Sequence, residues 1–200
     1  AMYRSFEKEM ASYPIRSVTF QTERFFLDHH PDLASHWDLV EDEETETWLG
    51  RDRTPYALDS RSDVKVLLAE PSYLDEIAQL HQQAFSDAEE TLEASRRYIT
   101  EALKDSDGLL YILLKEAQVI GVCTVDLSGN NNYLYGLAVA EAYRGQGYGS
   151  YLAKSVVNQL IAQNDKFFQI AVEDSNVGAK HLYEKIGFVK QTQVVYLKQK

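Results

Sequence analysis

From Val64 to the end of the chain, apolar and polar positions alternate in a way that predicts a regular succession of strands and helices. Short continuous apolar runs predict buried strands, and apolar residues three and four apart predict helices. Strands are predicted over 64–69, 109–114, 119–127, 133–140, 167–172 and 188–197, and helices over 71–85, 91–104, 151–161 and 176–185. The resulting order, β-α-α-β-β-β-α-β-α-β, predicts an α/β fold with a mixed central sheet and helices on both faces.

The N-terminal part follows another pattern, which predicts an extension over residues 1–62 ahead of a main domain over residues 63–200. The partly alternating run from Val18 to Leu27 predicts a strand, and residues 37–40 predict a second short one, so the extension is expected to contain a hairpin. The acidic run 41–46 is expected to be a solvated loop, followed by a polar linker. The extension is too small to bury a good core alone.

Composition narrows the possible partners. The formal net charge of -11 argues against a nucleic-acid partner, which needs a basic surface, and is compatible with a cationic amine substrate. No apolar run reaches the ~18 residues of a membrane helix and no signal peptide is recognisable, so a cytoplasmic protein without a membrane partner is expected. Ala1 before Met2 looks like a cloning remnant.

Metal-ligating residues are few. Cys123 is the only cysteine, which argues against a disulfide framework or a thiolate metal cluster. Three histidines lie between Asp28 and Asp38, but their spacing matches no standard zinc pattern. No metal site is therefore expected.

Residues 133–150 form the strongest candidate for a binding site. An apolar strand is followed by the glycine-rich turn Glu-Ala-Tyr-Arg-Gly-Gln-Gly-Tyr-Gly-Ser over 141–150, and then by a helix. Glycines let the backbone turn tightly and point N–H groups at a ligand, while the helix N-terminus adds partial positive charge. A pyrophosphate is the expected ligand, and a turn that merely joins strand to helix is the alternative.

The turn does not match two other nucleotide-binding motifs, the P-loop and the dinucleotide-binding motif. A P-loop needs Lys-Ser or Lys-Thr after its last glycine, whereas Gly149 is followed by Ser150 and Tyr151. A dinucleotide fold needs Gly-x-Gly-x-x-Gly, and the spacing here differs. Glu173 would pass as its ribose-binding acid, but only about 50 residues follow the turn, too few for the remaining units of that fold.

Two motifs together carry a resemblance. The run from Arg144 to Gly149, Arg-x-x-Gly-x-Gly after an apolar strand, resembles the acyl-CoA pyrophosphate loop of the GNAT (Gcn5-related) N-acetyltransferases. The run from Asn176 to Phe188, with Asn, Ala three residues on and then Leu-Tyr-x-x-x-Gly-Phe, resembles the last block of that family. Two motifs in the right order are more specific than either alone. The resemblance covers about two-thirds of the chain, and the predicted order of elements is also that of the GNAT fold.

The resemblance implies transfer of an acetyl group from acetyl-CoA, as acyl-donor cosubstrate, to a primary amine of a small molecule or peptide in a ternary complex. Pantetheine would lie between the strand 133–140 and the strand 167–172, where a backbone N–H near Leu137 or Ala138 would polarise the thioester carbonyl. The implied cofactor-binding residues are Leu137, Ala138, Val139, Arg144, Gly145, Gln146, Gly147, Tyr148, Gly149, Ser150, Asn176, Ala179 and Tyr183.

The resemblance also implies catalytic roles. Tyr183 occupies the place of the family's general acid, and a phenol with a pKa near 10 keeps its proton at neutral pH for a departing thiolate. Many members carry a glutamate base on the central strand, where this chain has Tyr135, and a tyrosine of ordinary pKa is a poor base. Glu173 is the alternative base. The missing glutamate favours a rival function, a non-catalytic acyl-CoA-binding or regulatory module, whereas Tyr183 favours an enzyme.

The end of the chain departs from the family, which usually closes with two strands. Only twelve residues follow Phe188, so the strand 18–27 is expected to complete the sheet edge, in the same chain or in a partner. The oligomeric state stays open, a homodimer included. The family takes acceptor contacts from the first two helices and the loop between them, and the acidic residues at 86–90 there favour a cationic acceptor.

Overall fold

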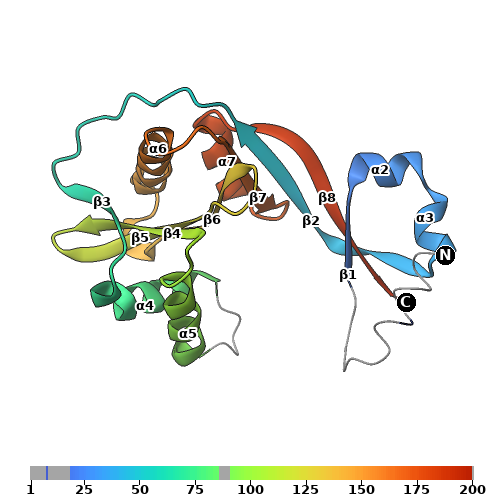
Figure 1. The fold of residues 1–200 in the computed structure, drawn as a ribbon, viewed down its shortest axis with the longest axis horizontal. Helices are drawn as coiled ribbons and strands as arrows, with labels where there is room; N and C mark the ends of the chain where they lie inside the picture. Colours follow the sequence, from blue (N-terminus) through green and yellow to red (C-terminus); the bar gives the residue numbers. More distant parts are fainter. Residues whose placement is uncertain (1–7, 9–18, 86–90, 200) are drawn as a thin grey trace. The chain divides into compact units, whose positions relative to one another are not determined.

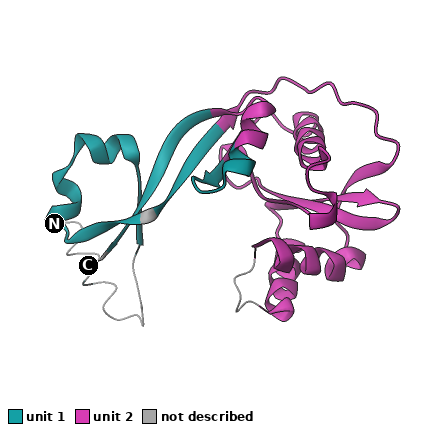
Figure 2. Cartoon of the chain, turned by 180° about the vertical axis from the view of Figure 1, so that it is seen from behind, with its two compact units in different colours: residues 1–49, 171–180, 190–200 teal, residues 50–170, 181–189 magenta. Residues whose placement is uncertain are grey.

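The structure is a computed structural model of the chain, and it describes residue 8 and residues 19–85 and 91–199. These residues group into two compact units, shown in two colours in Figure 2. Unit 1 comprises residues 1–49, 171–180 and 190–200, and unit 2 comprises residues 50–170 and 181–189. The division predicted between residues 62 and 63 stays a prediction.

Unit 2 contains a mostly antiparallel sheet with helices on both faces, which confirms the predicted fold class (Figure 1). Its strands run in the spatial order β7-β6-β5-β4-β3. Neighbours from β3 to β6 pair antiparallel, and β6 and β7 pair parallel. The bounds are β3 Val64–Leu68, β4 Gly108–Lys115, β5 Gln118–Asp126, β6 Asn131–Val139 and β7 Phe167–Glu173, whose last three residues belong to unit 1.

The helices of unit 2 cover the sheet because each carries an apolar face. The short helix η1 (Pro71–Tyr73) leads into α4 (Leu74–Phe85), and α5 (Leu92–Ala102) begins where the Thr91 side chain accepts a hydrogen bond from the N–H of Ala94. Figure 1 shows these helices on one face and α6 (Tyr148–Ile161) on the other. The core beneath α4 and α5 includes Ile77, Leu80, Ile99 and Ile112, and burial of such side chains contributes about 1.5–3 kcal/mol each.

Unit 1 is built around the C-terminal strand. Its elements are β1 (Thr19–Glu23), α2 (Arg24–His29), α3 (Asp32–His36) and most of β2 (Leu39–Arg51) and β8 (Val189–Gln199). The last two residues of β2 and the first of β8 belong to unit 2. β1 pairs antiparallel with β8, from Thr19 opposite Lys198 to Glu23 opposite Val194. The expectation that an N-terminal strand completes the sheet edge is therefore confirmed within the same chain, except at Val18, which lies outside the described residues.

The predicted hairpin is wrong, because β8 lies between β1 and β2. The predicted strand is also too long, since α2 begins at Arg24. Aromatic pairs one helical turn apart support this helix. The rings of Phe25 and His29 are tilted with centroids 4.2 Å apart, and those of Phe26 and His30, just after the helix, are 4.5 Å apart.

The acidic run 41–46 is a strand and not the predicted loop, because it lies inside β2. Cations from elsewhere in unit 1 pair with its first two residues. Glu41 forms an ion pair with Arg24, and Asp42 forms one with Lys198 at 3.2 Å. The β-formers Thr45 and Thr47 continue the strand.

No helix in the described part of the chain is long and apolar enough to cross a membrane.

Candidate functional site

A bulge interrupts β6 at the position expected for the thioester. Tyr135 is paired with Thr124 and Ala138 with Val122, so Gly136 and Leu137 together face one residue of β5. Gly136 has a φ of 59°, in the left-handed region that favours glycine. Pairing with β7 runs only as far as Leu134, while β6 continues to Val139. The bulge therefore takes backbone groups of β6 out of the regular ladder.

The glycine-rich turn leaves a row of backbone donors open. After the short helix η2 (Glu141–Tyr143), Gly145 and Gly147 turn the chain with φ of 74° and 81°, and α6 begins at Tyr148. Among the described residues, no acceptor is found for the N–H groups of residues 145–150, whereas the N–H of Tyr151 bonds the carbonyl of Gly147. No atom lies within 4 Å of where a Cβ on Gly145 would stand. The open backbone fits a pyrophosphate.

Arg144 lies beside this turn and is tied back to the sheet. Its Nε donates to the carbonyl oxygen of Val139 at 2.9 Å, which leaves the rest of an exposed guanidinium next to the open N–H groups.

Gly149 allows two helices to pack closely. A Cβ there would lie 3.0 Å from Cδ1 of Leu182, so glycine lets α7 (Val177–Lys185) approach the start of α6.

Tyr183 follows Leu182 on α7, and its side chain is only 5 % exposed. Its ring meets that of Phe188 edge-on, with centroids 6.1 Å apart. Burial raises the pKa of Tyr183 well above its ordinary value, and the nearby Cys123 and Tyr133 raise it further. Helix α7 ends as predicted at Gly187, with a φ of 90° and the N–H of Phe188 bonded to the carbonyl of Tyr183 at 3.0 Å.

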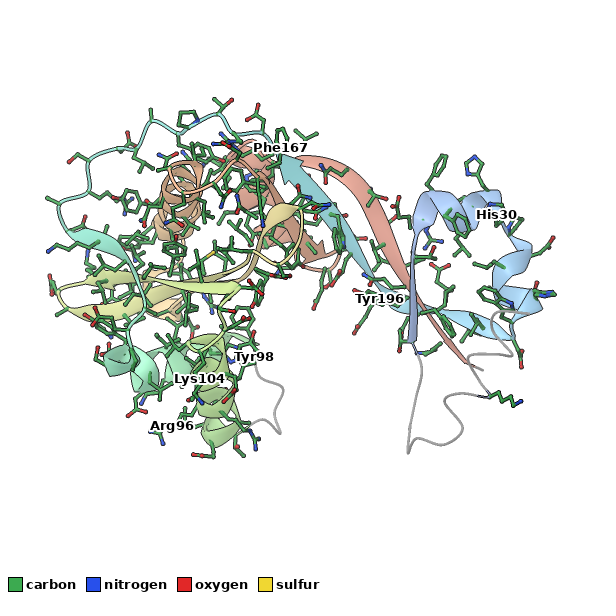
Figure 3. All side chains as sticks on the ribbon, in the orientation of Figure 1. His30, Arg96, Tyr98, Lys104, Phe167 and Tyr196 are labelled. Carbon is green, nitrogen blue, oxygen red and sulfur yellow. The ribbon has the colours of Figure 1, made fainter. Side chains whose placement is uncertain are left out.

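A pocket of about 330 Å³ opens at the other end of β6. It is lined by Asp105, Asp107, Asp126, Ser128, Tyr133 and Tyr135. The rings of Tyr133 and Tyr135 stack with centroids 5.8 Å apart. Burial, together with Tyr98 of α5 (labelled in Figure 3) and the carboxylates Asp126 and Asp105, raises the pKa of Tyr135 to about 12. Tyr135 therefore keeps its proton at neutral pH.

Three predicted site residues, Glu173, Asn176 and Ala179, belong to unit 1. Asn176 caps α7, as predicted, because its Oδ1 accepts a hydrogen bond from the N–H of Ala179 at 3.0 Å. Glu173 is exposed, and its carboxylate accepts a hydrogen bond from the hydroxyl of Ser175 at 3.4 Å.

The described residues contain no cluster of three or more histidine, cysteine or acidic side chains that could hold a metal ion. Cys123 is buried, and burial raises the pKa of its thiol to about 12.

A model of the Acetyltransferase (GNAT) family matches residues 74–188, more than half of the chain. The chain belongs to the GNAT acetyltransferase family. The match begins at α4 and ends one residue after Gly187, so it includes the bulged strand, the glycine-rich turn and Tyr183.

Other comparisons agree with this assignment. The GNAT chain is 32% identical over 89 residues to a [ribosomal protein bS18]-alanine N-acetyltransferase of Haemophilus influenzae and 30% identical over 89 residues to that of Haemophilus ducreyi. The matched part is 43% of this chain and 60% and 61% of those relatives, respectively, so the chain spans about 60% of their length. A GCN5-related N-acetyltransferase from Sphaerobacter thermophilus has the same fold, with a TM-score of 0.69 at 17% identity over 98% of this chain and 64% of that one.

The structure brings the bulge of β6, the glycine-rich turn and Tyr183 into unit 2 of this GNAT chain. Sequence reasoning missed two features of that unit, the acidic pocket and Arg61, whose guanidinium donates to the carbonyl of Gln146 at 2.9 Å. It also missed Asp174 of unit 1, which accepts hydrogen bonds from Thr45 and Lys180. The pocket residues, Arg61 and Asp174 contact residues that are distant in the sequence, so no local sequence pattern predicts these contacts. The acidic residues expected at 86–90 lie outside the described residues.

Proposed function

We propose that this chain is an acetyl-CoA-dependent N-acetyltransferase that moves an acetyl group to a primary amine by direct attack in a ternary complex. The open row of N–H groups at residues 145–150 carries the proposal, because it follows a bulged strand and precedes a helix in the family's order. Acetyl-CoA supplies the activated acyl group. Residues 145–150 hold its pyrophosphate, and residues 137–139 on β6 present backbone groups to pantetheine and to the thioester.

In the reaction, the amine nitrogen forms a bond to the thioester carbonyl carbon, and the carbon–sulfur bond breaks. Tyr183 gives its proton to the departing thiolate of CoA. The raised pKa keeps the phenol fully protonated at neutral pH, so a proton is in place when the thiolate departs. Gly149 supports the arrangement by letting α7 and the start of α6 approach closely.

The attacking amine loses a proton to a base. Tyr135 stands where many family members have a glutamate, but a pKa of about 12 makes it a donor of hydrogen bonds and not a base. Glu173 is the proposed base, acting directly or through water. It is an exposed carboxylate on β7, and Asn176, three residues further on, opens α7.

The acidic pocket supports a cationic acceptor. Three carboxylates and two stacked phenol rings line a space of about 330 Å³, a combination that favours ammonium groups through charge and through cation–π contact. The names of the Haemophilus relatives describe acetylation of an alanine of a ribosomal protein. A peptide with a free N-terminal amine and basic residues is therefore a proposed acceptor class beside small polyamines.

A second candidate is a non-catalytic acyl-CoA-binding or regulatory module. The observation in its favour is the raised pKa of Tyr135 at the place of the usual base. Such a module would bind acetyl-CoA with the same loop and transfer nothing.

The first test is calorimetric binding of acetyl-CoA to the wild type and to Gly147→Trp. Gly147 has a φ of 81°, and a Cβ there would lie 3.3 Å from Nη2 of Arg61, so a tryptophan would fill the cradle. We expect binding by the wild type and a loss of at least about 100-fold in the variant. Gly129→Trp is the control, because no atom lies within 4 Å of a Cβ at that loop position.

Turnover of acetyl-CoA against amines then separates the two candidates. The enzyme is expected to acetylate cationic amines, polyamines and basic peptides with a higher kcat/KM than neutral amines. Binding without turnover of any amine would favour the module, and a wild type that does not bind acetyl-CoA would reject both.

A further inference from the structure

Residues 52–63, here called the strap, join β2 to β3 and pass along α6 (Figure 1). Near the C-terminal end of α6, Nη2 of Arg53 donates to the carbonyl of Ile161 at 3.1 Å. Further along, the N–H of Tyr56 donates to Oδ1 of Asn158 at 2.8 Å, and Nδ2 of Asn158 donates back to the carbonyl of Tyr56 at 2.9 Å. The strap therefore follows the helix toward its N-terminus.

Because the strap follows α6 in this way, Arg61 lies at the glycine-rich turn. Its Nη2 donates to the carbonyl of Gln146 at 2.9 Å and lies 3.3 Å from where a Cβ on Gly147 would stand. The guanidinium carbon is 4.6 Å from the ring centroid of Tyr148 and 5.8 Å from that of Tyr151. The planar cation thus covers the first turn of α6.

The end of the strap fixes this position. Two residues after Arg61, the carboxylate of Asp63 accepts hydrogen bonds from Nζ of Lys115 at 2.8 Å and from the hydroxyl of Tyr148 at 3.0 Å. Tyr148 is buried and belongs to the turn itself. Arg61 is therefore held between two anchored points and is not the end of a free linker.

Two arginine side chains, Arg61 and Arg144, lie at this turn. None of the ion pairs among the described residues involves Arg61 or Arg144, and the carboxylate of Asp63 is paired with Lys115. The N-terminus of α6 adds a partial charge of about +0.5, and the N–H groups of residues 145–150 have no acceptor among the residues that the structure describes. Such an arrangement is favourable when an anion occupies it.

We propose that Arg61 is a binding residue for the pyrophosphate of CoA, donating to it from the strap while the turn donates from below. The inference rests on the proposed function and adds a residue to it, because Arg61 lies outside the matched family region 74–188. The pyrophosphate is assigned rather than the 3′-phosphate, since Arg61 contacts Gln146 and Gly147 in the middle of the open N–H groups.

Calorimetry of the full chain with CoA and with 3′-dephospho-CoA tests this assignment. Arg61→Gln is expected to weaken both ligands equally, by about tenfold, because a charge-assisted hydrogen bond to phosphate is lost. Arg61→Lys keeps the charge without the planar fork and is expected to lose less. The control is Arg97→Gln on α5, an exposed arginine with the same change of charge, which should bind both ligands like the wild type.

Salt dependence separates a charge contact from a purely structural one. If Arg61 meets phosphate, the fall of log affinity with log salt is shallower in Arg61→Gln than in the wild type. An unchanged slope would overturn the assignment, since Arg61 would then only support the carbonyl of Gln146. A loss confined to CoA would also overturn it in favour of the 3′-phosphate. Equal binding by the wild type and Arg61→Gln would reject the role of Arg61 and leave the proposed function standing. A wild type that binds neither ligand would reject the proposed function as well.

Discussion

At the scale of single residues, Tyr183 combines deep burial with a position next to the contact between α7 and the glycine-rich turn. Tyr183→Phe keeps the buried ring and removes only the hydroxyl. We expect kcat for acetyl transfer to fall by about 100-fold or more, because the leaving thiolate loses its proton donor. The Kd for acetyl-CoA should change by less than about threefold, since the phenol acts only when the carbon–sulfur bond breaks.

The pH profile and a matched variant give independent readouts. Because the pKa of Tyr183 is raised, this acid stays protonated above pH 10 and contributes no alkaline fall in rate below that pH. Tyr111→Phe is the control, as Tyr111 is a fully buried tyrosine of β4. A Tyr183→Phe enzyme with unchanged kcat would show that the phenol is a core residue only.

The carboxylate of Asp174 in unit 1 accepts four side-chain hydrogen bonds. Thr45 and Thr47 each donate to it at 2.5 Å, Gln193 donates at 2.5 Å and Lys180 at 2.7 Å. Partial burial alone would raise its pKa, but these four donors together hold the pKa of Asp174 well below its ordinary value. Because the folded state favours the charged form, the stabilisation is complete above the unfolded pKa of about 4 and is lost as pH falls toward the folded pKa.

Asp174→Asn should therefore lower the free energy of unfolding by about 1–3 kcal/mol at pH 7, since charged hydrogen bonds become neutral ones and Lys180 loses its partner. Urea unfolding from pH 7 down to pH 3 is the measurement, and the difference from wild type should shrink below about pH 4. The exposed Asp59→Asn is the control. A difference that does not vary with pH would contradict a role for the charge.

At the scale of elements, the sequence predicted those helices, strands and turns that depend on interactions between residues close together in the chain. The strands and helices from β3 to β8 follow from apolar periodicity, and Asn176 and Gly187 marked the two ends of α7. The glycine-rich turn was recognisable because its conformation needs glycine at 145 and 147.

The elements that were missed depend on contacts across the chain. The acidic run lies in β2, where Glu41 pairs with Arg24 and Asp42 with Lys198. The pairing partner of β1 is nearly 180 positions away. Arg61 is 85 residues from Gln146, and Asp174 is 129 residues from Thr45. No periodicity of a single segment encodes such pairs, so these contacts could not be predicted from the sequence.

At the scale of the whole molecule, the N-terminal segment supplies both neighbours of β8 in unit 1. Leu27 and Leu39 pack with Val195 and Leu197 in a cluster in which each is at most 8 % exposed. The strap adds hydrogen bonds to α6 in unit 2. The extension therefore contributes to the stability of the folded chain.

Deletion of residues 2–60 tests this contribution. It removes Leu27 and Leu39 and exposes Val195 and Leu197, and four such side chains at about 1.5–3 kcal/mol each amount to much of the 5–15 kcal/mol that stabilises a typical domain. We expect Tm to fall by more than about 10 °C, or cooperative unfolding to be lost. A chain lacking only residues 2–18 keeps β1 and serves as the control. Equal melting temperatures for the wild type and the long deletion would mean that β8 needs neither neighbour, and the pairing of β1 with β8 would then carry no stability.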